Sequence, residues 1–436
     1  MPAPDHRRHH FGLLLTLVLA AIGARAEGPG PVDPHAEEAT VAGTTPLTTE
    51  EAVGLALTNS RQLQSLNTMV EIQDYRSHST GRRDNPELRV RNLSTRNENE
   101  RFDELEIGLR WRPPALGAAA EERQRGQVGL WERKVEAQRA GDWLGSRVRR
   151  ACADVILYRE LVRLAAARVD NETQRIVQIK TMVDLGRRSI VYYTKAKMMV
   201  SEAKNEHTRY LQALGEEERR LQRLLGVSTT IDVAFEPLPE VNRDRQELLA
   251  IAYAHRPEIP LVESRQRLAV KQHQREDRRR LPWISFVEVS HHREQGADDW
   301  QELMFGVELP LFGRNGGRSK ATRLGIARKE VQALAIREGI EDEVYDTFSA
   351  YDEARLTWQL VRDDGQLLIE DASRLIAEAS AHGTIHADEV LELERTIMDT
   401  RVILARRRRE LARTIYFLWY ALGIERPQQA APPADR

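Results

Sequence analysis

The chain has 436 residues, which is enough for two or three domains or for one extended architecture. Its 65 basic and 67 acidic residues nearly balance, so no bulk charge favours nucleic acid as a partner. A hydrophobic fraction of 41%, with 30% charged and 6% aromatic residues, is typical of a helix-rich, well-solvated chain more than of a compact enzyme. The sequence has no nucleotide-binding loop, catalytic triad signature or cysteine cluster, so we expect neither an enzyme nor a cofactor.

The N-terminus has the three parts of a secretory signal peptide. Two arginines precede an apolar run over residues 11–22, and Ala24-Arg25-Ala26 supplies small residues at the spacing of a signal-peptidase site. We therefore predict that residues 1–26 are removed on export. Residues 27–47 are rich in Pro, Gly, Ala and Thr and are predicted to form a flexible leader.

Residues 48–226 are predicted to form the first of two repeats, which begins with a helix. Thr48 can cap the first-turn amides, and Glu50 and Glu51 complement the helix dipole. The apolar positions that follow have helical spacing, so we expect one amphipathic helix that reaches Arg82.

After this helix the periodicity changes from helical to alternating. Leu88 and Val90 alternate with arginines, and after a polar loop over residues 94–101 an apolar residue occupies every second position between 105 and 111. Two such runs about a polar loop predict a β-hairpin with one apolar face.

Two very long antiparallel helices are predicted next. Residues 115–236 contain no proline, and apolar residues over 193–224 recur in steps of three and four, which predicts a helix packed lengthwise on other helices. Gly186 is the best place for the chain to turn between the helices, and Gly226 ends the second. Cys152, the single cysteine, is predicted to be a small core residue on the first helix.

The same order then recurs, which indicates a tandem duplication. Residues 227–244 are predicted to be a linker, residues 245–424 the second repeat, and residues 425–436 a disordered tail. Strands are predicted over 283–289 and 303–309, on either side of a polar loop at 291–299. Gly383 and Gly423 fall on Gly186 and Gly226 of the first repeat at one common offset.

The predicted strands allow two readings. Two hairpins leave open sheet edges, and an exported protein can remove such edges by closing a barrel from several copies, with apolar side chains facing lipid and charged ones facing water. The candidate lipid-facing residues are Leu105, Ile107, Leu109, Trp111, Leu303, Phe305 and Val307. Aromatic residues in or beside the hairpins could be interfacial anchors or core: Phe102, Trp111, Trp283, Phe286, Trp300 and Phe305. The alternative is a soluble periplasmic coiled-coil scaffold or adaptor, in which the hairpins form a small sheet with one buried face.

The duplicated set of motifs resembles the TolC-like outer-membrane efflux family over about residues 47–424. The resemblance rests on the order of elements, on the strand-to-helix junction at residues 307–312, and on the helix ends Leu224-Leu225-Gly226 and Ala421-Leu422-Gly423. The motif Asn85-Pro86-Glu87-Leu88 resembles the corresponding motif in the branch of this family that serves heavy-metal and cation efflux systems.

The resemblance implies a mainly α fold with membrane β. Three chains would form a twelve-stranded barrel in the outer membrane of a Gram-negative bacterium, continued by a periplasmic α-helical barrel. Such a homotrimer docks on a periplasmic adaptor and an inner-membrane pump of the RND or ABC type. It passively conducts substrate to the exterior and contacts outer-membrane lipid.

The resemblance also assigns roles to residues at the ends of the long helices. The tips that contact the adaptor would include the following residues: Gly186, Ser189, Gly383, Thr384 and Ile385. Glu389 and Glu392, three apart on one helical face, would form the channel constriction; an ordinary solvated helix face is the alternative.

Two pairs of histidines remain. His382 and His386 are four residues apart, and His291 and His292 are adjacent, but neither pair has a third ligand at a recognisable spacing. We therefore expect tip and loop histidines and no metal site.

Overall fold

The computed structural model describes residues 46–82, 84–96, 101–229, 231–294, 298–311, 316–382 and 387–424, all within the unit Thr45–Arg436. One order of elements occurs twice in it. The first set is α2 (Thr49–Asn59), α3 (Arg61–Ser79), β1 (Glu87–Arg96), β2 (Arg101–Trp111), α4 (Ala118–Asp184) and α5 (Ile190–Leu225). The second set is α6 (Arg245–His255), α7 (Glu258–Arg278), β3 (Trp283–Glu294), β4 (Trp300–Glu308), α8 (Gly316–His382) and α9 (Ala387–Leu422). The unit is therefore mainly helical, as predicted, and it contains one small antiparallel sheet.

The first helix starts as predicted but is not continuous. Thr48 and Glu51 form a capping box at the start of α2. The prediction of one helix reaching Arg82 is wrong, because the backbone is extended at Ser60 and α3 ends at Ser79. The Ser60 hydroxyl accepts a hydrogen bond from the Leu63 N–H at 3.3 Å, so this serine caps a new helix.

Each repeat ties its short-helix break to the end of its second long helix. The Asn59 side-chain amide donates to the carbonyl of Leu225 at 2.9 Å, and the Arg256 Nε–H donates to the carbonyl of Ala421 at 2.6 Å. Gly226 and Gly423 end α5 and α9 with positive φ angles of 68° and 69°, which a residue with a Cβ rarely adopts. In both repeats a terminal carbonyl of the second long helix therefore accepts a side-chain hydrogen bond, from an asparagine amide in the first repeat and from an arginine in the second.

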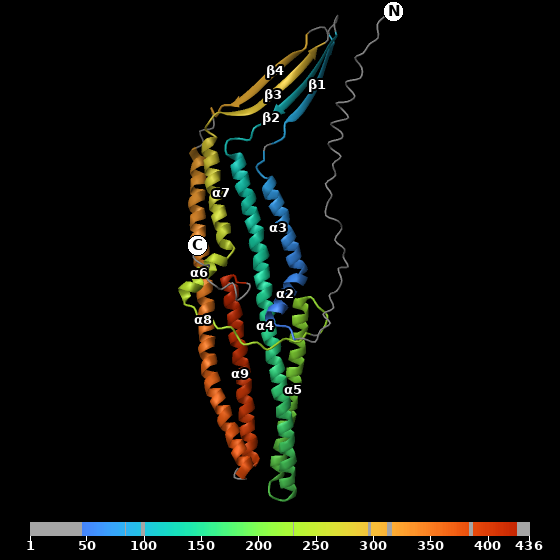
Figure 1. The fold of residues 1–436 in the computed structure, drawn as a ribbon, viewed down its shortest axis with the longest axis vertical. Helices are drawn as coiled ribbons and strands as arrows, with labels where there is room; N and C mark the ends of the chain where they lie inside the picture. Colours follow the sequence, from blue (N-terminus) through green and yellow to red (C-terminus); the bar gives the residue numbers. More distant parts are fainter. Residues whose placement is uncertain are drawn as a thin grey trace, which may run out of the picture. The chain divides into compact units, whose positions relative to one another are not determined.

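The strands form one antiparallel sheet in the order β1-β2-β3-β4. Both predicted hairpins are confirmed, and β2 pairs with β3 to join the two repeats, with Glu106 opposite His292. β1 runs to Arg96 and β3 runs to Glu294, so both strands extend into residues that were predicted to be loop. Figure 1 shows the sheet beyond the ends of α3 and α7.

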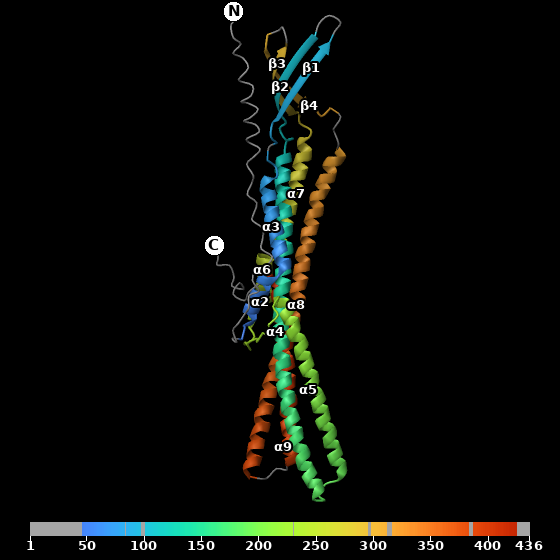
Figure 2. The same ribbon diagram turned by 90° about the vertical axis from the view of Figure 1, so that its right-hand side faces the viewer.

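The long helices form two antiparallel pairs, as predicted. α4 and α8 each have 67 residues, which corresponds to about 100 Å at ~1.5 Å per residue. The last turns of α4 and α8 and the first turns of α5 and α9 lie at the end of the unit farthest from the sheet (Figures 1 and 2). α4 lies against α9, so the first pair packs on the second.

Two hydrophobic clusters hold the middle of the helices together. One joins α6, α8 and α9 through residues such as Leu248, Val344 and Leu418. The other joins α2, α4 and α5 and contains Cys152, which is buried as predicted. Each fully buried leucine of this kind stabilises the fold by roughly 1.5–3 kcal/mol relative to an exposed one.

Candidate functional site

One face of the sheet is apolar and exposed. Leu88, Leu109, Val289 and Leu303 lie opposite one another on the four strands, and 50–67% of each is exposed. Five of the seven strand residues predicted to face lipid are exposed: Ile107, Leu109, Leu303, Phe305 and Val307. The other two, Leu105 and Trp111, are partly buried. An exposed apolar face of this extent marks a surface that is covered by something other than water.

The opposite face is charged and largely buried. Glu288 is 3% exposed and pairs with Arg89 at 3.1 Å and Arg110 at 2.7 Å. Glu106, 9% exposed, pairs with Arg91 at 3.1 Å. The sheet is therefore inverted relative to a soluble one, in which the apolar face is buried and the charged face is solvated.

His292 belongs to this charged face, although it was predicted to lie in a loop. It is 5% exposed in β3, its ring stacks on Trp300 with centroids 3.8 Å apart, and its Nδ1 lies 2.8 Å from a Glu104 carboxylate oxygen. No sequence signal extended the strand this far, because the alternation of apolar and polar residues ends at Val289 and residues 290–292 are all polar.

The aromatic residues of the hairpins divide between the two faces. Phe305 is on the exposed apolar face, whereas Trp300 stacks on His292 and Phe286 lies beneath the Arg110 guanidinium at 4.4 Å. A register shift between Ile284 and Phe286 precedes this arrangement. The charged face is thus also packed by rings.

The turn between α4 and α5 is a compact tip. Gly186 has a φ angle of +75°, and the Arg187 N–H donates to the Met182 carbonyl at 2.8 Å, which closes the end of α4. Ser189 caps α5 by accepting from the Val191 N–H at 3.3 Å. The other predicted tip residues lie outside the described residues: Gly383, Thr384 and Ile385.

The two predicted constriction residues lie at the start of α9. Glu389 and Glu392 are both exposed, and they are within one helical turn of each other. Nearby, α9 contacts α4 through polar groups: Glu394 accepts from the Asn171 amide at 3.0 Å, and Arg168 lies 4.0 Å from Asp399. These two contacts between α4 and α9 are polar, unlike the apolar clusters in the middle of the helices.

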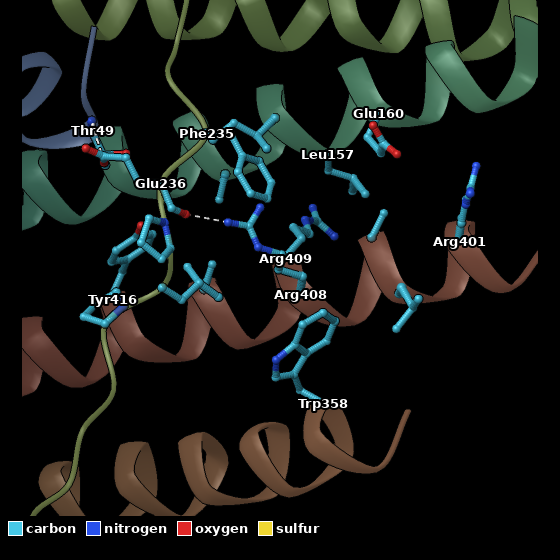
Figure 3. Close-up of a pocket in the computed structure, with 18 of the residues that line it drawn as sticks. Thr49, Leu157, Glu160, Phe235, Glu236, Trp358, Arg401, Arg408, Arg409 and Tyr416 are labelled. Atoms are coloured by element: carbon cyan, nitrogen blue, oxygen red, sulfur yellow. Dashed lines mark hydrogen bonds between the residues drawn. The ribbon is translucent and has the colours of Figure 1, made fainter. Parts of the chain in front are cut away.

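A cavity of about 680 Å³ lies between α4, α8, α9 and the segment that joins the repeats (Figure 3). Arg408 lies over the Phe235 ring at 3.4 Å and donates to the Glu236 carbonyl, while Arg409 pairs with Asp154 at 2.6 Å. The Arg408 contacts hold the linker against α9, and the Arg409–Asp154 pair joins α9 to α4. The apolar walls of the cavity include Leu157 and Trp358.

None of the described helices is both long and apolar enough to cross a membrane. Within the described ranges, no three or more His, Cys, Asp or Glu side chains are placed to hold a metal ion together.

Comparisons with known proteins identify the fold. No protein-family model and no curated protein sequence matches the chain. Among solved structures, CusC superimposes with a TM-score of 0.68 at 16% identity, covering 92% of this chain and 99% of CusC. The outer-membrane protein VceC of Vibrio cholerae gives 0.67 at 14% identity over 86% of this chain and 96% of VceC. The MtrE outer-membrane channel of Neisseria gonorrhoeae gives 0.65 at 14% identity over 86% and 89%.

These structures include the sheet and the long helices in one arrangement, and each is matched over almost its whole length. The fold that the resemblance to TolC-like proteins implies for one chain is thus confirmed. The chain has the fold of the TolC-like outer-membrane channels.

Proposed function

We propose that the protein is the outer-membrane exit duct of a tripartite efflux or secretion system, which passively conducts substrate to the cell exterior. The observation that carries the proposal is the inverted sheet. Its exposed face is apolar, and its opposite face holds Glu106, Glu288 and the arginines that pair with them. A wall between lipid and a water-filled lumen needs this polarity, and a soluble periplasmic scaffold needs the opposite one. The likeness in fold to outer-membrane channels supports the same reading.

The proposed assembly is a homotrimer. β1 and β4 are the edges of the four-stranded sheet, and three sheets joined edge to edge would form a closed barrel of twelve strands. α8 also carries exposed apolar residues over much of its length: Leu324, Val331, Tyr345, Leu356, Leu360 and Leu367. Burial of this stripe against helices of a second copy would continue the barrel as a periplasmic tunnel.

The end of the tunnel is proposed to dock on a periplasmic adaptor and an inner-membrane pump of the RND or ABC type. The described tip presents Leu185, Ile190 and Val191, which are 61–68% exposed. Apolar side chains on a compact, capped turn are suited to insertion between helices of a partner.

Glu389 and Glu392 are proposed to form a cation-binding constriction. Replacing both by glutamine removes negative charge and leaves the helix surface in place, so cation selectivity in planar bilayers should fall at neutral pH. The control is Glu330→Gln on α8, an exposed glutamate outside the apolar stripe of that helix. Equal selectivity of the constriction variant and the wild type would refute this role.

The duct itself is tested by a pair of neighbouring substitutions on β4. Phe305 is on the apolar face, and Met304 is on the charged face opposite Glu288. Phe305→Lys should destabilise the inserted protein by about 2–4 kcal/mol and lower trimer yield, because a lysine would face lipid. Met304→Lys should be tolerated.

The assay separates the wild type and both variants into soluble and outer-membrane fractions and measures the mass of each pool. Recovery of wild type from the outer membrane with detergent, at about three times the monomer mass, supports the duct. A soluble periplasmic species, or equal tolerance of both lysines, would favour the scaffold.

A further inference from the structure

His292 lies in a cluster of charged groups from three strands. Its Nδ1 is 2.8 Å from Glu104 on β2, and its Nε2 is 3.2 Å from Glu302 on β4 and 3.0 Å from the hydroxyl of Ser290 on β3. The histidine side chain is 7% exposed, and the two glutamates are 33% and 36% exposed. Trp300 covers one side of the ring at an interplanar angle of 5°.

The hydrogen-bond geometry distinguishes two protonation states of the ring. An imidazolium can donate to Glu104 and Glu302 at once, because both ring nitrogens carry a proton. A neutral imidazole that donates from Nδ1 to Glu104 has only a lone pair at Nε2, where the Ser290 hydroxyl can donate to it. Glu302 then loses its charged partner.

The charge of this part of the face therefore depends on one proton. Besides Glu104 and Glu302, the groups that face His292 are Glu106 of β2, which Arg91 of β1 neutralises at 3.1 Å, and the Ser290 hydroxyl. Two carboxylates then remain against one imidazolium at low pH, and two against none at higher pH. Elsewhere on the face, Glu288 pairs with Arg89 and Arg110.

We infer that the His292 cluster is an ion-selectivity site of the channel wall, with Glu302 released to attract cations when His292 is neutral. This inference rests on the proposed function, because the charged face then lines the lumen. The cluster lies near the hairpin end of β3, so in the trimer three copies would form a ring toward one mouth of the barrel. A ring of carboxylates raises the local concentration of cations and lowers that of anions.

The test measures reversal potentials of the purified full-length protein in planar bilayers across a KCl gradient near 0.1 M, where charges act over about 10 Å. Between about pH 5 and pH 8 a histidine changes charge while ordinary carboxylates remain ionised. The wild-type potassium-to-chloride permeability ratio should rise about twofold or more over this interval. His292→Gln should show the higher ratio at both pH values.

His291 supplies a matched control, because it is the adjacent histidine on the opposite face, where it lies 3.6 Å from Asp299. His291→Gln should keep the wild-type pH response. Glu302→Gln should give a lower ratio than the wild type at pH 8, because one of the two carboxylates of the cluster is removed. An unchanged ratio at pH 8 in this variant would refute the inference even if His292→Gln forms no channels. A wild-type channel whose selectivity is the same at both pH values, or a response lost in His291→Gln, would refute the inference alone. Absence of any conductance in the wild type would refute the duct and the inference together.

Discussion

Arg256 joins α7, α8 and α9 of the second repeat, and its replacement by methionine is a direct test of how α9 is held. The side chain is 1% exposed and donates to the Ala421 carbonyl at the end of α9. It also pairs with Glu343 of α8 at 2.5 Å and lies 3.7 Å from Glu258 of α7. Methionine fills a similar volume without charge or donors, so the variant removes these interactions and leaves little cavity.

The loss of stability depends on which hydrogen-bond and ion-pair partners remain for the groups that Arg256 now contacts. The Ala421 carbonyl would lose its buried donor, which costs about 1–3 kcal/mol. Glu258 and Glu343 would keep Arg139, which pairs with both in the native structure. Their loss is therefore smaller than the roughly 3–5 kcal/mol seen when a buried charge is left without any partner. We expect Arg256→Met to lower the free energy of unfolding by about 2–4 kcal/mol.

The measurement is denaturant unfolding of the detergent-solubilised protein, followed by far-ultraviolet circular dichroism at fixed protein concentration. Arg133→Met is the control, because Arg133 and Glu136 form an exposed pair on one helix, with 48% and 49% of their side chains exposed. That variant should change stability by less than about 0.5 kcal/mol. If Arg256→Met matches the control, the carbonyl has found water or another donor, and the proposed fastening of α9 is wrong.

Two further predictions concern Gly226 and Cys152. Gly226→Ala should destabilise the protein by about 1–2 kcal/mol in the same unfolding assay, because φ is +68° and an added Cβ would lie 3.2 Å from the Asn59 Cβ. The control is Gly215→Ala, where an added Cβ meets nothing within 4 Å. Burial raises the pKa of the Cys152 thiol to about 12 from 9.0, so alkylation at neutral pH should require unfolding. The same pKa shift favours the folded state fully below about pH 9, and this contribution to stability disappears as the pH rises toward 12. Cys152→Ala should remove that part of the pH dependence of stability. An equally steep loss of stability in the variant would contradict the prediction.

Much of the helical architecture could be predicted because its signals are local. The capping box at Thr48, the positive-φ glycines and the absence of proline each act within a few residues. The break at Ser60 was missed for a physical reason. Helical spacing of apolar residues continues through residue 63, and a serine can occur inside a helix as well as cap one.

Alternation predicted an apolar and a charged side of the sheet, but it could not predict which charged residues pair across the strands. Glu104 and His292 are 188 residues apart and meet only because β2 pairs with β3. Residues 291–294 were predicted to be loop because they are polar. That rule assumes that polar residues avoid strands, and it fails where one face of a sheet is built from ion pairs.

The exposed surfaces of the described unit require two different coverings. The strand edges and the apolar stripe of α8 can be satisfied by further copies of the chain, because edges pair with edges and helices pack on helices. Closing a barrel does not cover the face that carries Leu109, Leu303 and Phe305, since edge-to-edge pairing leaves each sheet face where it was. A soluble oligomer would need another layer over that face, whereas a lipid bilayer supplies one without any further protein. The edges therefore argue for copies of the chain, and the face argues for a membrane.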